Sequence, residues 1–267
     1  MISIKKSKIK NQKSKMLLSA ENLTIGYSAQ HPVAANLSLT LAKGQLTSLL
    51  GPNGVGKSTL LRTLANLQRP LAGTISVGGN SIANLAAQEL SRTIALVLTD
   101  RVSAGRLTVF ELVSLGRQPY TGFFGRLTAA DKELVIKAMT DVGIAAKADC
   151  HVSELSDGER QKVMIAKALA QQTPIIILDE PTAFLDAAAR VEVLLLLHRL
   201  AAESQKAILL STHDIDVAVQ LSDNLWLMNA DGVQSGSVAE IIENGSLDNL
   251  FKDSNLHFDA AERRFVW

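Results

Sequence analysis

Three absences narrow what this chain of 267 residues can be. Cys150 is its only cysteine, which excludes an internal disulfide and suits a reducing compartment. Because His151 follows Cys150 directly, the two residues do not have the spacing of a zinc site. No run of about 18 apolar residues occurs, so we expect no membrane-spanning helix. The first residues also lack the apolar stretch of a secretory signal.

Acidic residues are missing from residues 1–15, which hold six lysines. The rest of the chain carries all 26 acidic residues and is net negative, although the whole chain has a formal charge of +1. Such a basic tail can contact nucleic acid or anionic lipid, or it can be a solvated, disordered extension. The sequence leaves these alternatives open.

The residues that are present predict a folded α/β protein. Apolar residues make up 47% and charged residues 20%, enough to bury a core. Strands alternate with helices, which predicts a largely parallel sheet, and a long helical stretch at 107–170 predicts a subdomain inserted into it. We expect strands at 16–25, 33–50 with a break at Gly44, 92–98, 174–181 and 206–214, and helices after residue 56, within 107–150 and at 187–203.

The segment "GPNGVGKS" matches the phosphate-binding pattern G-x-x-x-x-G-K-[ST] at Gly51, Gly56, Lys57 and Ser58. The glycines allow backbone N–H groups to surround a phosphate, the lysine contacts the terminal phosphates, and the serine hydroxyl binds Mg²⁺. The segment follows an apolar strand and precedes a helix, which is the context that this pattern requires. The sequence therefore predicts a nucleotide site here.

Polar residues end two other predicted strands. Asp179 and Glu180 follow "IIIL", and His213 follows "ILLST". Ligands bind at the carboxyl edge of parallel sheets, so Asp179 is placed to hold Mg²⁺ and Glu180 to polarise an attacking water. His213 is placed to contact a γ-phosphate and orient that water.

A second helix start, in "SELSDGERQKVMIAKAL" (153–169), has the features of another anion site. Ser156 and Glu159 have the spacing of a capping box, and Gly158 lies in the first turn. A helix N-terminus offers N–H groups and a positive dipole end to an anion. The same residues can also be a plain helix start.

Together these motifs resemble the ATP-binding cassette (ABC) transporter ATPases. The motifs occur in the order "GPNGVGKS", "LSDGE", "IIILDEP", "AFLD", "STHD", and the resemblance covers nearly the whole of residues 16–235. The resemblance implies a P-loop NTPase fold, α/β with a mixed, largely parallel sheet and an α-helical subdomain at about 89–165. Residues 1–15 would then be a tail and 236–267 a C-terminal extension.

The resemblance also implies roles for single residues, with ATP and Mg²⁺ as cofactors. Catalytic roles fall to Glu180, His213 and Lys57. Residues that contact the nucleotide are Tyr27, which would stack on adenine, Asn53, Gly54, Gly56, Lys57, Ser58, Thr59, Ser156, Gly158, Glu159 and Asp186. Metal contacts fall to Ser58, Asp179, Thr99 and Asp100. Tyr27 can equally be a core residue.

The sequence departs from the family pattern in three places. The family usually has a glutamine after the strand equivalent to "IALVL", where this chain has Thr99 and Asp100, and either could replace it. In the signature, Asp157 replaces a glycine and Glu159 a glutamine. Phe184 stands where the family often has alanine or glycine.

Residues Gly116–Gly122 resemble the branch that serves importers of iron–siderophore complexes, haem and cobalamin, although the same residues can be a turn between two helices. We therefore expect an ATP-hydrolysing subunit at the cytoplasmic face of the cell membrane. Its expected partners are a second copy of itself, integral membrane permease subunits and an extracytoplasmic substrate-binding protein, with no nucleic acid. Alternatives are a soluble ABC-type ATPase acting on nucleic acid or the ribosome, a non-hydrolysing regulatory module, and an exporter.

Overall fold

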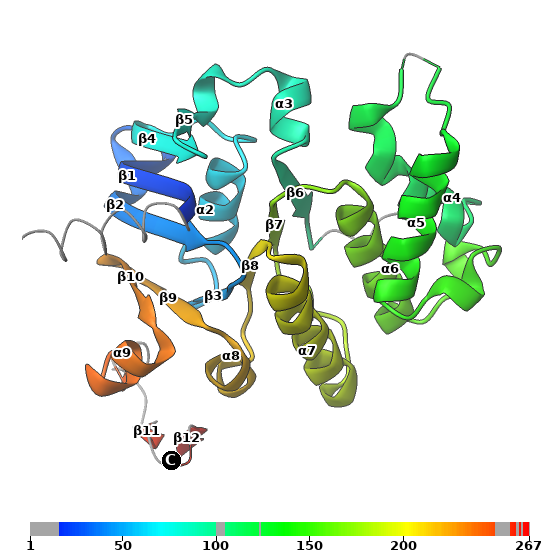
Figure 1. Cartoon of the computed structure of the whole chain (residues 1–267). Coiled ribbons are helices and arrows are strands. Elements are labelled where there is room, and N and C mark those ends of the chain that lie inside the picture. The colour runs from blue at the N-terminus through cyan, green and yellow to red at the C-terminus, as the bar shows by residue number, and fades with distance from the viewer. Residues whose placement is uncertain are drawn as a thin grey trace, which may run out of the picture.

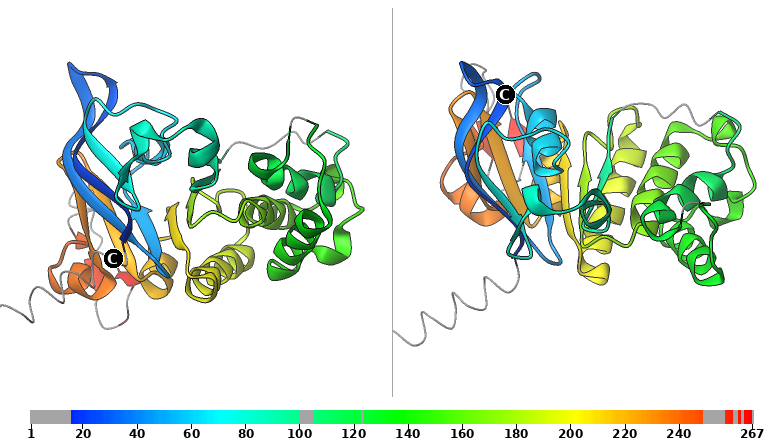
Figure 2. Two further views of the ribbon diagram at one scale, coloured as in Figure 1. Left: turned by 45° about the horizontal axis from the view of Figure 1, so that its top comes forward. Right: turned by 90° about the horizontal axis from the view of Figure 1, so that it is seen from above.

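The structure is a computed structural model that describes residues 16–99, 105–122, 124–248, 257–259, 262 and 264–266. Two sheets lie side by side and a lobe of helices extends from one of them (Figure 1). The two turned views in Figure 2 show the same separation between the sheets and the helical lobe.

The first sheet is antiparallel and has the strand order β2-β1-β4-β5. Apolar side chains of β1, such as Leu18, Leu23 and Ile25, are buried on the face that packs on the rest of the molecule. This alternation is typical of a sheet with one solvated face. Its strands are β1 (Met16–Ser28), β2 (His31–Ala42), β4 (Ala72–Val77) and β5 (Asn80–Ser81).

The second sheet has the order β10-β9-β3-β8-β7-β6, in which β9 to β6 are parallel and β10 is antiparallel to β9. Its central strands are buried along their whole length, because helices and the first sheet cover both faces. The predicted fold class is confirmed. The strands are β3 (Leu46–Leu50), β6 (Ile94–Val97), β7 (Ile175–Leu178), β8 (Ala207–Ser211), β9 (Asn224–Asn229) and β10 (Gly232–Ser237).

Helices complete three hydrophobic cores. One core lies between the two sheets and includes α2, one joins the helical lobe and α7 to the other face of the second sheet, and a smaller one lies under α8 and α9. Outside the lobe lie α2 (Lys57–Leu64), α3 (Ala87–Ser91), α7 (Ala187–Ser204), α8 (Ile215–Leu221) and α9 (Val238–Glu243). Short elements are η1 (Ile82–Asn84), η3 (Ala145–Lys147), η4 (Val152–Glu154), β11 (His257–Asp259) and β12 (Arg264–Val266).

The helical lobe contains α4 (Val109–Ser114), η2 (Leu115–Tyr120), α5 (Ala129–Asp141) and α6 (Asp157–Ala170). Thr128 and Asp131 form the capping box that opens α5, and Gly143 follows its end with a φ of 75°. Strand β6 lies within the range 89–165 and pairs with β7 in the second sheet. The domain boundaries given above remain predictions.

Residues Gly116–Gly122 form more than a turn. Arg117 makes a buried ion pair with Asp131 at 2.9 Å, and its guanidinium carbon lies 4.0 Å from the centroid of the Tyr120 ring. Arg92, just after α3, lies 4.8 Å from the same ring and donates to Pro119 O. The Tyr120 hydroxyl donates to Gln171 O, and Gln171 Nε2 donates to Ser91 O. We call Arg92, Arg117, Tyr120 and Gln171 the arginine–tyrosine clasp; it joins the helical lobe to α3 and β6.

Candidate nucleotide site

The predicted phosphate loop connects β3 to α2. Gly54 and Gly56 have φ angles of 76° and 112°, in the left-handed region that favours glycine. A Cβ on Gly56 would lie 2.1 Å from Val33 Cγ1, so β2 presses directly on the loop. Space and conformation both require glycine at Gly56, which explains why the pattern has a glycine there.

Lys57 lies inside the curl of this loop and is only 5% exposed. Its ammonium donates to Gly51 O at 2.9 Å and to Pro52 O at 3.1 Å. Burial lowers the pKa of Lys57 below its usual range, and the nearby carboxylates Glu180 and Asp179 act in the opposite direction. An anionic ligand in the loop would favour the charged ammonium in the same way as these carboxylates.

Tyr27 lies at the edge of this loop rather than in the core. Its side chain is 75% exposed, and its hydroxyl is 3.3 Å from Thr59 Oγ1 in the first turn of α2. The alternative that Tyr27 is a core residue is therefore wrong. An exposed ring tethered beside a phosphate loop is able to stack on a flat base.

Asp179, Glu180 and His213 meet at the carboxyl edge of the second sheet. Asp179 is 3% exposed and follows β7, while His213 follows β8, the neighbouring strand. The Nε2 atom of His213 lies 2.6 Å from Oε1 of Glu180, so an ionised Glu180 accepts this hydrogen bond from the Nε2–H tautomer. The side chains of His213 and Glu180 are 43% and 26% exposed, which leaves the pair within reach of water.

Two hydroxyl groups hold the Asp179–Glu180 turn. Thr99, which follows β6, donates through Oγ1 to Asp179 O at 2.8 Å. Ser211, at the end of β8, donates to Asp179 Oδ1 and accepts from the backbone N–H of Glu180, both at 2.8 Å. Sequence reasoning missed Ser211, because "ILLS" reads simply as a buried strand. Asp100, the other candidate for the missing glutamine, lies outside the described residues.

The donor set near the loop fits a magnesium ion bound together with a phosphate ligand. Mg²⁺ in nucleotide sites takes one or two protein oxygens and completes its shell with phosphate and water. The buried carboxylate of Asp179 and the half-buried hydroxyl of Ser58 are oxygen ligands of this kind. Among the described residues there is no cluster of three His, Cys, Asp or Glu side chains that could hold a metal ion.

The second predicted anion site lies at the start of α6. Ser156 is its exposed N-cap, and its Oγ accepts from Glu159 N at 3.3 Å while Glu159 Oε2 accepts from Ser156 N at 3.0 Å. Lys147 also pairs with Glu159 at 2.5 Å. These contacts, the one from Lys147 above all, lower the pKa of Glu159 to about 2. The capping box is confirmed, and the carboxylate of Glu159 is already engaged within its own chain.

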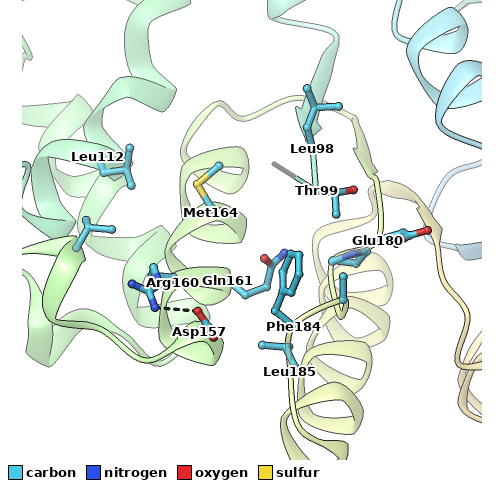
Figure 3. Close-up of a pocket in the computed structure, with 13 residues that line it drawn as sticks. Leu98, Thr99, Leu112, Asp157, Arg160, Gln161, Met164, Glu180, Phe184 and Leu185 are labelled. Carbon is cyan, nitrogen blue, oxygen red and sulfur yellow. Dashed lines mark hydrogen bonds and ion pairs between the residues drawn. The ribbon is translucent and has the colours of Figure 1, made fainter. Parts of the chain in front are cut away.

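A pocket of about 240 Å³ separates α6 from the Asp179–Glu180 turn. Figure 3 shows Arg160 and Met164 on the helical side and Thr99 and Glu180 on the sheet side, with Phe184 between them. Asp157, the residue that replaces a signature glycine, pairs with Arg160 at 2.8 Å. The start of α6 therefore approaches the carboxyl edge of the sheet without closing on it.

Comparison with known proteins identifies the fold and motifs. The sequence profile of the ABC transporter family matches residues 34–183, more than half of the chain. The chain belongs to the ABC transporter family. ATP-binding proteins of ABC transporters hydrolyse ATP to power transport, so ATP is the nucleotide that this chain binds and hydrolyses.

Two relatives illustrate this ABC transporter membership. A ferric enterobactin transport ATP-binding protein of Escherichia coli is 38% identical over 88% of this chain and 86% of its own length. An iron(3+)-hydroxamate import ATP-binding protein of Bacillus subtilis is 36% identical over 88% of this chain and 87% of its own. Among solved structures, cbiO1 of Clostridium perfringens, part of the ABC transporter complex cbiONQ, has a TM-score of 0.77 at 28% identity and covers 89% of this chain and 96% of its own.

The remaining observations on this ABC chain concern the predicted nucleotide contact Asp186 and the helices. Asp186, in its "AFLD" segment, is the N-cap of α7, and its Oδ1 accepts from Ala189 N at 2.8 Å. Within the part of the chain that the structure describes, no helix is long and apolar enough to cross a membrane.

Proposed function

We propose that this chain is the ATP-hydrolysing subunit of an importer that drives uptake of an iron chelate through separate permease subunits. The observation that carries the chemistry is the 2.6 Å contact between Glu180 and His213 beside the buried ammonium of Lys57. The cargo class rests on the two relatives, whose names specify ferric enterobactin and iron(3+)-hydroxamate. Haem and cobalamin remain alternatives from the sequence.

The geometry supports in-line attack of water on the γ-phosphate of ATP. Glu180 accepts a hydrogen bond from the water and His213 keeps the Glu180 carboxylate aimed, while Lys57 stabilises negative charge on the terminal phosphates. Ser58 and Asp179 would hold Mg²⁺, which supplies further charge neutralisation when bound. Tyr27 would stack on adenine above Thr59.

The start of α6 would act on the nucleotide of a second copy. Ser156 is the exposed N-cap of α6, and Asp157 in the first turn of this helix lines the pocket described above. In a head-to-tail pair, each ATP would contact the phosphate loop of one copy and residues Ser156, Gly158 and Glu159 of the other. We further propose a location at the cytoplasmic face of the cell membrane, together with an extracytoplasmic substrate-binding protein.

Replacement of Glu180 by glutamine tests the catalytic assignment. Glu180→Gln should lower kcat for ATP about 100-fold or more, because proton transfer by a placed base typically contributes about 10² to 10⁴ in rate. ATP affinity should change by less than about threefold, since the phosphate loop is untouched. Glu192→Gln, on the exposed face of α7, is the matched control and should hydrolyse ATP normally. Wild-type turnover in Glu180→Gln would contradict the assignment.

Transport itself needs the membrane partners. The chain should co-purify with integral membrane subunits, and vesicles containing the complex should take up radioactive iron as its enterobactin or hydroxamate chelate only when ATP is present. Parallel assays with haem and cobalamin test the other cargoes. Uptake that proceeds equally with Glu180→Gln, or failure to recover any membrane partner, would contradict the importer function.

A further inference from the structure

Ser211 is a polar residue at the end of a strand that is otherwise apolar. It ends β8, whose preceding residues Ala207–Leu210 are all apolar, and it is fully buried. Burying an unpaired hydroxyl costs on the order of 1–3 kcal/mol, so such a residue needs hydrogen-bond partners. Both partners of Ser211 belong to the Asp179–Glu180 turn on the neighbouring strand.

The backbone of Glu180 explains why this turn needs support. Glu180 has a φ of 48°, in the left-handed region that costs a residue with a Cβ about 1–2 kcal/mol. Glycine would adopt this conformation without strain but would supply no carboxylate. The Ser211 oxygen accepts the Glu180 N–H at 2.8 Å, which stabilises the strained conformation directly.

The same hydroxyl also fixes the carboxylate of Asp179. Its hydrogen is donated to Oδ1 at 2.8 Å, which leaves Oδ2 and the remaining lone pairs for other ligands. Thr99 and Val97 hold only the main chain of this residue, through Asp179 O and Asp179 N. Ser211 is thus the group that connects the side chain of Asp179 to the main chain of Glu180.

We propose that Ser211 is a positioning residue of the ATP-hydrolysing site. It orients Asp179 toward a divalent cation and holds Glu180 in the left-handed conformation that lets its Oε1 reach His213. The inference rests on the proposed function, because it assigns those two roles to Asp179 and Glu180. It goes beyond that function by predicting that metal binding and turnover depend on one hydroxyl on a neighbouring strand.

Ser48 provides a matched control. It is also a fully buried serine of the second sheet, on β3, and its Oγ lies 2.6 Å from Ser222 Oγ. Its strand leads to the phosphate loop, but its hydroxyl does not contact Asp179 or Glu180. Ser48→Ala should therefore lose a similar amount of stability without changing the orientation of either carboxylate.

The experiment compares Ser211→Ala, Ser211→Cys and Ser211→Thr with Ser48→Ala and the unmodified chain. Measurements are the thermal midpoint, the KM for ATP, kcat, and the dissociation constant of Mn²⁺ from the protein–ATP complex by electron paramagnetic resonance. Loss of a partner that orients a metal ligand typically costs about 10- to 100-fold in metal affinity or activity. We expect Ser211→Ala and Ser211→Cys to lower kcat and weaken Mn²⁺ binding by about tenfold or more, with KM for ATP within about twofold. Ser211→Thr, which keeps the hydroxyl, should recover most of both.

The outcomes distinguish a positioning role of Ser211 from a purely structural one. If Ser211→Ala and Ser48→Ala lose equal stability and have equal kcat and Mn²⁺ affinity, Ser211 is only a satisfied core residue and the inference is overturned. Should Ser211→Ala fail to fold, Ser211→Cys, with its similar volume, decides the question by the same readouts. If the unmodified chain does not hydrolyse ATP, or if Glu180→Gln hydrolyses it normally, the proposed function fails, and that result is distinguishable because it does not involve Ser211.

Discussion

Two helices, α2 and α6, direct their N-termini toward expected phosphate positions, and they begin in opposite ways. The α2 helix follows Gly56, with no side-chain cap and no acidic residue in its first turn. The α6 helix follows Ser156, with a complete capping box and the acids Asp157 and Glu159 in its first turn. Backbone donors at the start of α2 are left for a ligand, whereas those at the start of α6 are partly used by the chain itself.

This difference indicates which site is complete in one chain. The phosphate loop has its own buried cation, Lys57, and is pressed into shape by Val33 of β2. The start of α6 has an exposed N-cap, and its acids Asp157 and Glu159 already engage the nearby cations Arg160 and Lys147, so it is a weaker anion site than the phosphate loop. It fits our proposal that the ligand is presented there by a second copy, already bound to its own phosphate loop.

The largest expected effect is a loss of ATP affinity at the phosphate loop, the site that one chain completes alone. Lys57→Met should weaken ATP binding about 100-fold, because it removes a buried ammonium that contacts the phosphates. Lys206→Met is the matched control, since burial also lowers the pKa of Lys206, whose ammonium donates to Thr173 O at the opposite edge of the sheet. Titration calorimetry with ATP measures both. Equal affinities in the two variants would remove the distinction between a complete and an incomplete site.

A different effect is expected at the incomplete site. Ser156→Arg should leave ATP binding by one chain within about threefold but abolish cooperative hydrolysis, because the long cation obstructs the approach of a second copy's nucleotide. Both it and its control, Ser237→Arg at the capping box of α9, should lose about 1 kcal/mol of stability with the cap. ATPase rates across a range of protein concentrations test this. Normal cooperativity in Ser156→Arg would leave the start of α6 as a plain helix cap.

The smallest expected effect concerns the charge at α6. The pKa of Glu159 falls from 4.5 to about 2 in the folded chain, so its ion pair and capping contacts stabilise the fold above about pH 4.5 and lose that effect as the pH falls toward 2. Above about pH 4.5, Glu159→Gln should lower the free energy of unfolding by at most about 1 kcal/mol, because water screens the ion pair with Lys147. Urea unfolding between pH 2 and 6 measures the difference. Glu240→Gln at α9, where Ser237 alone lowers the pKa, should show a weaker pH dependence.

The sequence predicted the parts of the site that depend on local spacing. The phosphate loop, the capping box of α6 and the acids after β7 all follow from residues close together in the chain. Contacts between residues on different strands were not predicted, because they depend on the order of the strands in the sheet. The contact of Ser211 with Asp179 exists only because β8 pairs with β7, and the position of Tyr27 depends on how the first sheet lies over α2. Strands β4, β9 and β10 and helix α8 were not predicted, because they lack a motif and their apolar patterns are short.

The arginine–tyrosine clasp has a mechanical consequence for α6. This helix has 14 residues and is therefore about 21 Å long, with Ser156 at one end and Gln171 of the clasp at the other. With one end of α6 held by the clasp, a tilt of the helix by about 10° about that end would shift Ser156 by about 4 Å for a helix of this length. A small change of angle near Tyr120 would thus displace the start of α6 by more than the length of a hydrogen bond.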